Sequence, residues 1–172
     1  MLLFLDTEFT DFTTRGLISI ALVSLDGEHE FYAEHTDFDY DACSGFVRAK
    51  VWAHLGRYPA ARVKRTEMGP RLAQWFDKFT QPITLACDSD VDQELLLVAL
   101  AGQARPELTK SVDLRPMLAT SCAKQHLRKF YSLDLPAHHA LYDARALRSA
   151  WMTCGLGGNL GTQLGTGGGR GV

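Results

Sequence analysis

Three apolar segments stand close together at the start of the chain, before any segment with helical spacing. They cover residues 2–5, 17–24 and 29–33, and the turn sequence Leu-Asp-Gly-Glu separates the last two. Short apolar runs bounded by turn residues are typical of strands. Strands joined by short connections pair antiparallel. The first 33 residues therefore predict a three-stranded antiparallel meander.

The pattern changes beyond residue 40. Helical spacing covers 41–55 and 65–79, where the dipeptide Gly69-Pro70 suits a helix start. A strand is then predicted at 82–87, a helix at 91–102 ending at Gly102, a strand at 108–114, and helices at 116–131 and 139–154. Strands that alternate with helices predict parallel β-α-β units. We therefore expect an α/β fold with a mixed five-stranded sheet, three antiparallel strands followed by parallel ones, flanked by helices.

The length of 172 residues suggests one folded domain, which we place at 1–155, followed by a Gly-rich disordered tail at 156–172. No signal peptide or membrane-spanning run is visible, so we expect a cytoplasmic protein without a membrane partner. The net charge of −2 argues against non-specific duplex binding. The cysteines form no CxxC pair, so reduced and mostly buried thiols are expected at Cys43, Cys87, Cys122 and Cys154.

Asp6 and Glu8 follow the first apolar run and lie two residues apart. In a strand, residues i and i+2 point to the same face, so both carboxylates converge if the strand continues through them. Two such carboxylates repel each other unless a cation or a proton lies between them. The alternative is a strand that ends by residue 6 and leaves two solvated acids in a turn.

Two later segments carry further candidates. Asp88, Asp90 and Asp92 follow the predicted strand 82–87, at the kind of strand end where sites gather in α/β sheets. One of these aspartates could instead cap the following helix. In the segment PAHHALYDARAL, His138 lies five residues before Asp143. Asp143 has no arginine three or four positions away that would pair with it on a helix. Surface histidines are the alternative for His138 and His139.

Together these segments predict four carboxylates and one histidine at the ends of core elements. Carboxylates without paired bases need positive charge, and oxygen-rich sites suit Mg²⁺ or Mn²⁺ better than Zn²⁺. A pair of such ions is the arrangement used for phosphodiester hydrolysis. A neutral histidine beside them can accept the proton of the attacking water.

This set of motifs resembles the DEDDh superfamily of 3′–5′ exonucleases, which includes the proofreading subunit of bacterial DNA polymerase, ribonuclease T and oligoribonuclease. FLDTEFT resembles the first motif, CDSDVDQELL the second and HHALYDARAL the third, which is the most specific. The resemblance spans residues 2 to about 151. In size and in its Asp-x-Glu-Phe start, the chain is most similar to the small bacterial 3′–5′ exoribonuclease-like branch.

The resemblance implies a ribonuclease H-like fold and a two-metal 3′–5′ exonuclease that acts on 3′ ends of single-stranded nucleic acid, with RNA favoured over DNA. A homodimer is common among relatives. Two Mg²⁺ (or Mn²⁺) ions would be held by four carboxylates, with Asp88 as the alternative ligand in the second motif, and His138 rather than His139 would be the general base. The four implied ligands are Asp6, Glu8, Asp92 and Asp143.

Candidate substrate-binding residues are Thr7 and Phe9. Phe9 would stack on the 3′-terminal base or belong to the core. The basic clusters at 62–65 and 124–129 could meet phosphates or form ordinary solvated surfaces. Alternatives to an exoribonuclease are a 3′–5′ exodeoxyribonuclease, a non-catalytic nucleic-acid-binding module on the same fold, and a ribonuclease H-type endonuclease, against which the histidine five residues before Asp143 argues.

Overall fold

The computed structural model describes residues 1–155 apart from 101, 102, 104 and 106. Within this part of the chain, six strands form one sheet in the order β4-β3-β2-β1-β5-β6. The strands are β1 Leu2–Phe9, β2 Leu17–Ser24, β3 Glu30–His35, β4 Arg62–Val63, β5 Ile83–Cys87 and β6 Leu108–Asp113.

The pairing of the strands confirms the predicted mixed sheet. β1, β2 and β3 form the antiparallel meander, whereas β5 pairs parallel with both β1 and β6. The predicted number of five strands is wrong, because β4 adds a sixth strand parallel to β3. β4 has only two residues, which is too short for an alternating pattern to be visible in the sequence.

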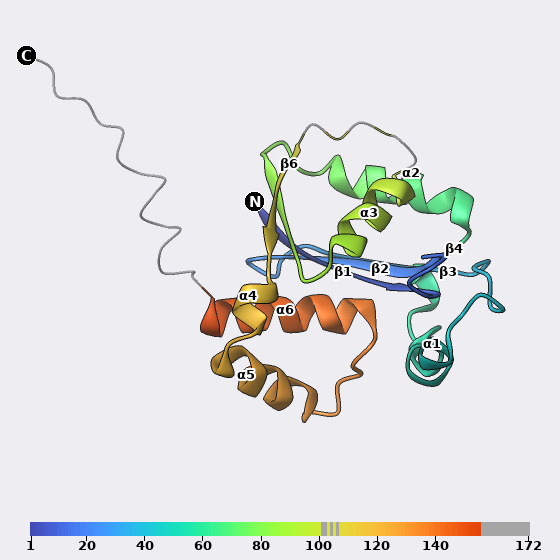
Figure 1. Ribbon diagram of the computed structural model, residues 1–172. Coiled ribbons are helices and arrows are strands. Elements are labelled where there is room, and N and C mark those ends of the chain that lie inside the picture. The colour runs from blue at the N-terminus through green and yellow to red at the C-terminus, as the bar shows by residue number, and fades with distance from the viewer. Residues whose placement is uncertain (101–102, 104, 106, 156–172) are drawn as a thin grey trace, which may run out of the picture.

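Helices cover both faces of the sheet (Figure 1). α2 and α3 lie on one face, and α4, α5 and α6 lie on the other. The α helices are α1 Gly45–Lys50, α2 Arg65–Phe76, α3 Asp90–Ala99, α4 Arg115–Leu118, α5 Ser121–Tyr131 and α6 Ala140–Cys154, and two short 3₁₀ helices are η1 Trp52–His54 and η2 Pro59–Ala61.

β1 is buried between the two helical layers and sends alternate side chains to each. Leu3 and Leu5 belong to the apolar cluster formed with α2 and α3. Phe4 belongs to a different cluster, together with Leu147 and Trp151 of α6. Because side chains alternate along a strand, the residues after Phe4 on the same face must point toward the α6 layer.

Several helix boundaries differ from the prediction because of local capping. α2 begins at Arg65 rather than near Gly69-Pro70, since the Glu67 carboxylate accepts the Lys64 backbone N–H at 2.9 Å and Pro70 lies inside the helix. The helix predicted at 116–131 is divided into α4 and α5, because the Thr120 side chain caps a new start by accepting the Ala123 N–H. The helix predicted at 41–55 is likewise divided into α1 and η1.

Cys122 of α5 and Cys154 of α6 form a disulfide. The prediction of reduced thiols is therefore wrong for these two residues, whereas Cys43 and Cys87 are free and buried. The two partners are 32 residues apart in sequence, but their Cα atoms are 5.9 Å apart, within the usual bridging range. Sequence spacing alone does not reveal such a pair, because the packing of α5 on α6 creates it.

Among the described residues, no helix has the length and apolar character needed to cross a membrane. The predicted Gly-rich tail at 156–172 lies outside the described residues, and so does Gly102, the predicted end of the helix at 91–102. The described helix α3 ends at Ala99, where the Leu100 N–H donates to the Leu96 carbonyl.

Candidate active site

The two acids of the first motif lie inside β1. The strand continues to Phe9, so Asp6 and Glu8 pair with Ala21 and Ser19 of β2 and follow Phe4 onto the α6 face. The alternative of a strand that ends by residue 6 is therefore wrong. On the other side of β1, β5 pairs only as far as Phe4. The end of β1 thus extends beyond β5 and leaves space beside both carboxylates.

Asp88, Asp90 and Asp92 have three different environments. None of them caps α3, because the Ser89 hydroxyl accepts the Val91 N–H at 3.2 Å. Asp90 is exposed and pairs with Arg115 at 3.2 Å. Asp92 is buried, and Asp88 is partly buried.

Asp92 is held by β1. The Thr7 hydroxyl donates to its Oδ1 at 2.6 Å, while its other oxygen, Oδ2, is buried without a hydrogen-bond partner among the described residues. A buried carboxylate oxygen without a partner is costly. This oxygen therefore requires a proton or a cation that the described side chains do not supply.

The third motif forms the turn into α6. Asp143 lies in the first turn of α6, where its Oδ2 accepts the His138 backbone N–H at 2.9 Å and its Oδ1 accepts the Tyr131 hydroxyl at 2.5 Å. His138 has a positive φ of 63°, in the left-handed region. This turn directs the two adjacent histidines to different places.

His138 and His139 have separate environments. His138 lies in a group with Glu8 and Asp143, and its ring contacts the Phe46 ring edge to face at 4.9 Å. The His139 ring is buried and stacks on Tyr32 at 4.7 Å, and its Nδ1 accepts the Leu141 N–H as the cap of α6. Burial lowers the pKa of His139 to about 4. The structure therefore brings His138, and not His139, to the carboxylates.

The predicted residues meet in two adjoining groups. Asp6, Asp88 and Asp92 form one group, and Glu8, His138 and Asp143 form the other, with candidate ligand atoms within 4.8 Å of one another in each. All six side chains line one cavity of about 310 Å³. The cavity is completed by Thr7, Phe9, Phe12, Ser89, Leu118, Leu127, Tyr131 and Leu147.

Burial, and then the charges of the neighbouring carboxylates, raise the pKa of the acids in the cavity. Burial, followed by the charges of Asp143 and Asp92, raises the pKa of Glu8 to about 8. Burial also raises the pKa of Asp92 to about 7, although the Thr7 hydroxyl opposes this shift. The pKa of Asp6 is raised well above its ordinary value, first by burial and then by the charge of Asp143. Without a cation the cavity thus favours protonated acids.

The predicted substrate contacts have different positions. Thr7 is buried and its hydroxyl is engaged with Asp92, so this side chain positions a carboxylate. Phe9 is partly buried and lies edge to face with Phe12 at 5.2 Å. Phe12 is 76% exposed, so an aromatic surface borders the cavity.

Tyr131 was not among the site residues predicted from the sequence. Its hydroxyl holds Asp143, and it lies at the end of α5, twelve residues before that aspartate. A loop and a helix start intervene, so no fixed spacing links the two residues. An aromatic residue with a polar tip at the end of an amphipathic helix was the available signal.

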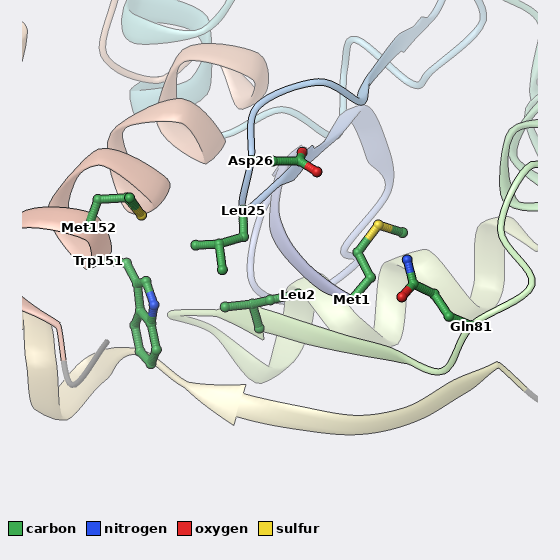
Figure 2. Close-up of a pocket in the computed structure, with 7 residues that line it drawn as sticks. All are labelled: Met1, Leu2, Leu25, Asp26, Gln81, Trp151 and Met152. Carbon is green, nitrogen blue, oxygen red and sulfur yellow. The ribbon is translucent and has the colours of Figure 1, made fainter. Parts of the chain in front are cut away.

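A larger cavity, of about 610 Å³, lies at the other end of β1 and α6. Figure 2 shows Met1, Leu2, Leu25 and Trp151 around it, with Asp26 as the one acid among its lining residues. The Asp26 carboxylate accepts the Ser24 hydroxyl and the Glu28 N–H, and no second acid lines this cavity, so carboxylates do not converge in it. The groups suited to catalysis therefore gather in the smaller cavity.

No protein-family model matches this chain, and a search of curated proteins finds no match.

Proposed function

We propose that this chain is a metal-dependent 3′–5′ exonuclease with a ribonuclease H-like fold, which hydrolyses single-stranded nucleic acid from the 3′ end and favours RNA. The observation that carries the proposal is the convergence of carboxylates from three distant segments, with His138, in one cavity. The mixed sheet with helices on both faces is compatible with the fold that the motifs imply.

The residues of the cavity fit divalent cations. The donors are carboxylate oxygens together with one imidazole, and the Asp92 Oδ2 atom is buried without a partner among the described residues. Such oxygen-rich sets suit Mg²⁺ or Mn²⁺. Two ions would be held by Asp6, Glu8, Asp92 and Asp143. Asp88 belongs to the same group as Asp6 and Asp92. When bound, such ions lower the pKa of an attacking water and stabilise the leaving oxygen.

His138 is the candidate general base. Its side chain forms no hydrogen bond within the part of the chain that the structure describes, so the ring is free to accept a proton. The hydrogen bond from its backbone to Asp143 fixes the turn that presents the ring to the carboxylates. Histidine is suited to accept a proton near neutral pH.

The cavity also supports binding of an unpaired terminal nucleotide. Phe9 and Phe12 form part of its lining, and aromatic side chains stack on nucleobases that are not base-paired. If the terminal base stacks on this aromatic surface, its phosphate would lie in the cavity that the carboxylates also line. We therefore assign Phe9, with Phe12, to the terminal base.

The test uses a short 5′-labelled single-stranded RNA and its DNA counterpart, incubated with Mg²⁺, Mn²⁺ or EDTA. We expect a metal-dependent ladder that shortens from the 3′ end, with faster hydrolysis of RNA. A circular single strand should stay intact, because it has no 3′ end. Cleavage of the circle would indicate an endonuclease, and metal-dependent binding without shortening of either linear strand would indicate a non-catalytic module.

A further inference from the structure

α5 carries two cations beside the side chains that line the cavity. Leu127 and Tyr131 contribute to the cavity wall. Lys124 lies three residues before Leu127, and Arg128 lies three residues before Tyr131. Because residues three or four apart share one side of a helix, both cations lie next to the cavity wall along α5.

The opposite side of α5 is fixed against α6. Ala123 is fully buried, and the His126 ring hydrogen-bonds the Ser149 hydroxyl at 2.8 Å. The disulfide from Cys122 joins the same two helices. α5 is thus held by one side, and the side with Lys124 and Arg128 stays in solvent.

Lys124 and Arg128 are exposed and form no ion pair with any described residue. Other exposed arginines do have carboxylate partners, as Arg15 has in Glu94. A pair of unpartnered cations at the border of an acidic cavity is available to an anionic ligand that enters the cavity at one end.

The other basic cluster, at 62–65, does not lie beside the cavity. Arg62, Lys64 and Arg65 lie at β4 and at the start of α2, and no residue of these two elements lines the cavity. In the sheet order, β4 is three strands away from β1, which is roughly 14 Å at the usual strand spacing. Of the two clusters, only the one on α5 belongs to an element that lines the cavity.

We propose that Lys124 and Arg128 bind successive backbone phosphates of a single strand whose 3′-terminal nucleotide occupies the cavity. This inference rests on the proposed function. Residues four apart on a helix are separated by about 6 Å along the axis, so the two cations contact separate phosphates. These phosphates lie on the 5′ side of the terminal nucleotide. α5 therefore determines how strongly the enzyme holds strands longer than one or two nucleotides.

The first test measures binding, independently of turnover. The fluorescence anisotropy of a short labelled RNA strand is recorded with Ca²⁺ at several salt concentrations, for the wild type, for Lys124→Gln with Arg128→Gln, and for the matched control Lys64→Gln with Arg65→Gln. We expect the α5 variant to raise the Kd about tenfold at low salt and to reduce the salt slope by about 1.4, since each contact contributes about 0.7. The control should stay within about twofold of the wild type. Equal Kd values for the two variants would overturn the proposal.

The second test separates this proposal from the proposed function. The p-nitrophenyl ester of a nucleoside 5′-monophosphate has no phosphate on the 5′ side of the cavity. Its kcat/KM should therefore be unchanged in the α5 variant, while the KM for the longer strand rises. An equal loss on both substrates would overturn the proposal, because it would indicate a distorted site. If the wild type hydrolyses neither substrate, the proposed function fails, and the binding measurement still decides the role of α5.

Discussion

At the scale of single residues, the adjacent histidines offer the sharpest contrast. His138 lies beside Glu8 and Asp143, whereas His139 is buried against Tyr32 and caps α6. We expect His138→Ala to lower kcat by about 10²–10⁴-fold, the usual contribution of a general base. His139→Ala should instead lower the stability, by about 1 kcal/mol for the lost cap and more for the lost packing.

The measurements that check this contrast are kcat/KM on a short RNA strand and thermal unfolding of each variant. Below its melting temperature, His139→Ala should retain most of the wild-type activity, and His138→Ala should melt close to the wild type. A comparable loss of kcat in both folded variants would show that the assignment of the base is wrong.

Glu8 gives a prediction about pH. Its pKa is about 8 in the folded, metal-free protein and about 4.5 in an unfolded chain. Between these values the folded state holds a proton that the unfolded state has lost, so the free energy of unfolding falls as pH rises through this window. Asp6 and Asp92 act in the same direction because their pKa values are also raised. The Tm of the metal-free protein should therefore decrease between about pH 5 and about pH 8.

Glu8→Gln tests this prediction against a matched control. Glu28 is exposed and its carboxylate forms no hydrogen bond or ion pair with the described residues. Glu8→Gln should reduce the fall of the Tm with pH, abolish hydrolysis and weaken the stabilisation by Mg²⁺, whereas Glu28→Gln should behave like the wild type. A fall of the Tm that is the same in Glu8→Gln and in the wild type would show that the raised pKa of Glu8 does not cause it.

The acids of the site could be predicted from the sequence because their chemistry is local. Asp6 and Glu8 are two residues apart on a strand, and Asp143 has no arginine three or four positions away on its helix. Both patterns therefore indicated that the carboxylates need a cation. The choice between Asp88 and Asp92 could not be made in the same way. Both side chains reach the first group, because β5 ends before the end of β1 and the chain turns across the gap.

At the scale of elements, α5 and α6 together position Asp143. The Tyr131 hydroxyl from α5 holds the Asp143 carboxylate and favours its charged form. Tyr131→Phe removes this donor, so the pKa of Asp143 should rise and the affinity for Mg²⁺ at neutral pH should fall by about tenfold, as for other residues that orient a metal ligand. Isothermal titration calorimetry of the metal-free protein with Mg²⁺ measures the affinity.

Tyr142→Phe is the matched control for Tyr131→Phe. Tyr142 precedes Asp143 on α6, but its hydroxyl bonds to the Tyr58 hydroxyl at 3.0 Å and not to a carboxylate of the site. We expect this variant to bind Mg²⁺ like the wild type. An unchanged affinity in Tyr131→Phe as well would mean that the hydrogen bond does not contribute to the site.

The elements themselves were predicted with uneven success. Long segments with a clear pattern, such as the apolar strand at 17–24 and the helix at 139–154, appear where the sequence places them. Boundaries set by single side chains were missed, as at Thr120, where the hydroxyl divides one predicted helix into two. Helix propensity is a property of a whole segment. A helix cap is a single hydrogen bond, and whether a side chain forms it depends on the local backbone conformation.

At the scale of the whole molecule, the site depends on the order of the strands. β1 contributes two acids, and its two neighbouring strands differ: β2 pairs with β1 from Leu3 to Phe9, whereas β5 pairs only from Leu2 to Phe4. The sequence predicts which strands are antiparallel and which are parallel, but not where neighbouring strands end relative to one another. That difference in length opens the cavity toward α3 and α6, which contribute Asp92 and Asp143 to its lining.

The disulfide joins α6, which carries Asp143, to α5, which carries Lys124 and Arg128. Cys122 and Cys154 enclose a loop of about thirty residues, for which chain entropy predicts a stabilisation of about 3–4 kcal/mol. The double variant Cys122→Ser, Cys154→Ser should therefore melt roughly 10 °C lower than the oxidised wild type. A thiol reductant should lower the Tm of the wild type by a similar amount.

The double variant also provides the control for reduction. Cys43 and Cys87 are buried and unbonded, so a reductant has no other disulfide to break within the described residues. The Tm of the double variant should thus be insensitive to the reductant. Because α5 holds Asp143 through Tyr131 and is itself fixed by the disulfide, reduction should also weaken Mg²⁺ binding in the wild type. A wild type that melts and binds Mg²⁺ identically with and without reductant would show that the packing of α5 on α6 is sufficient on its own.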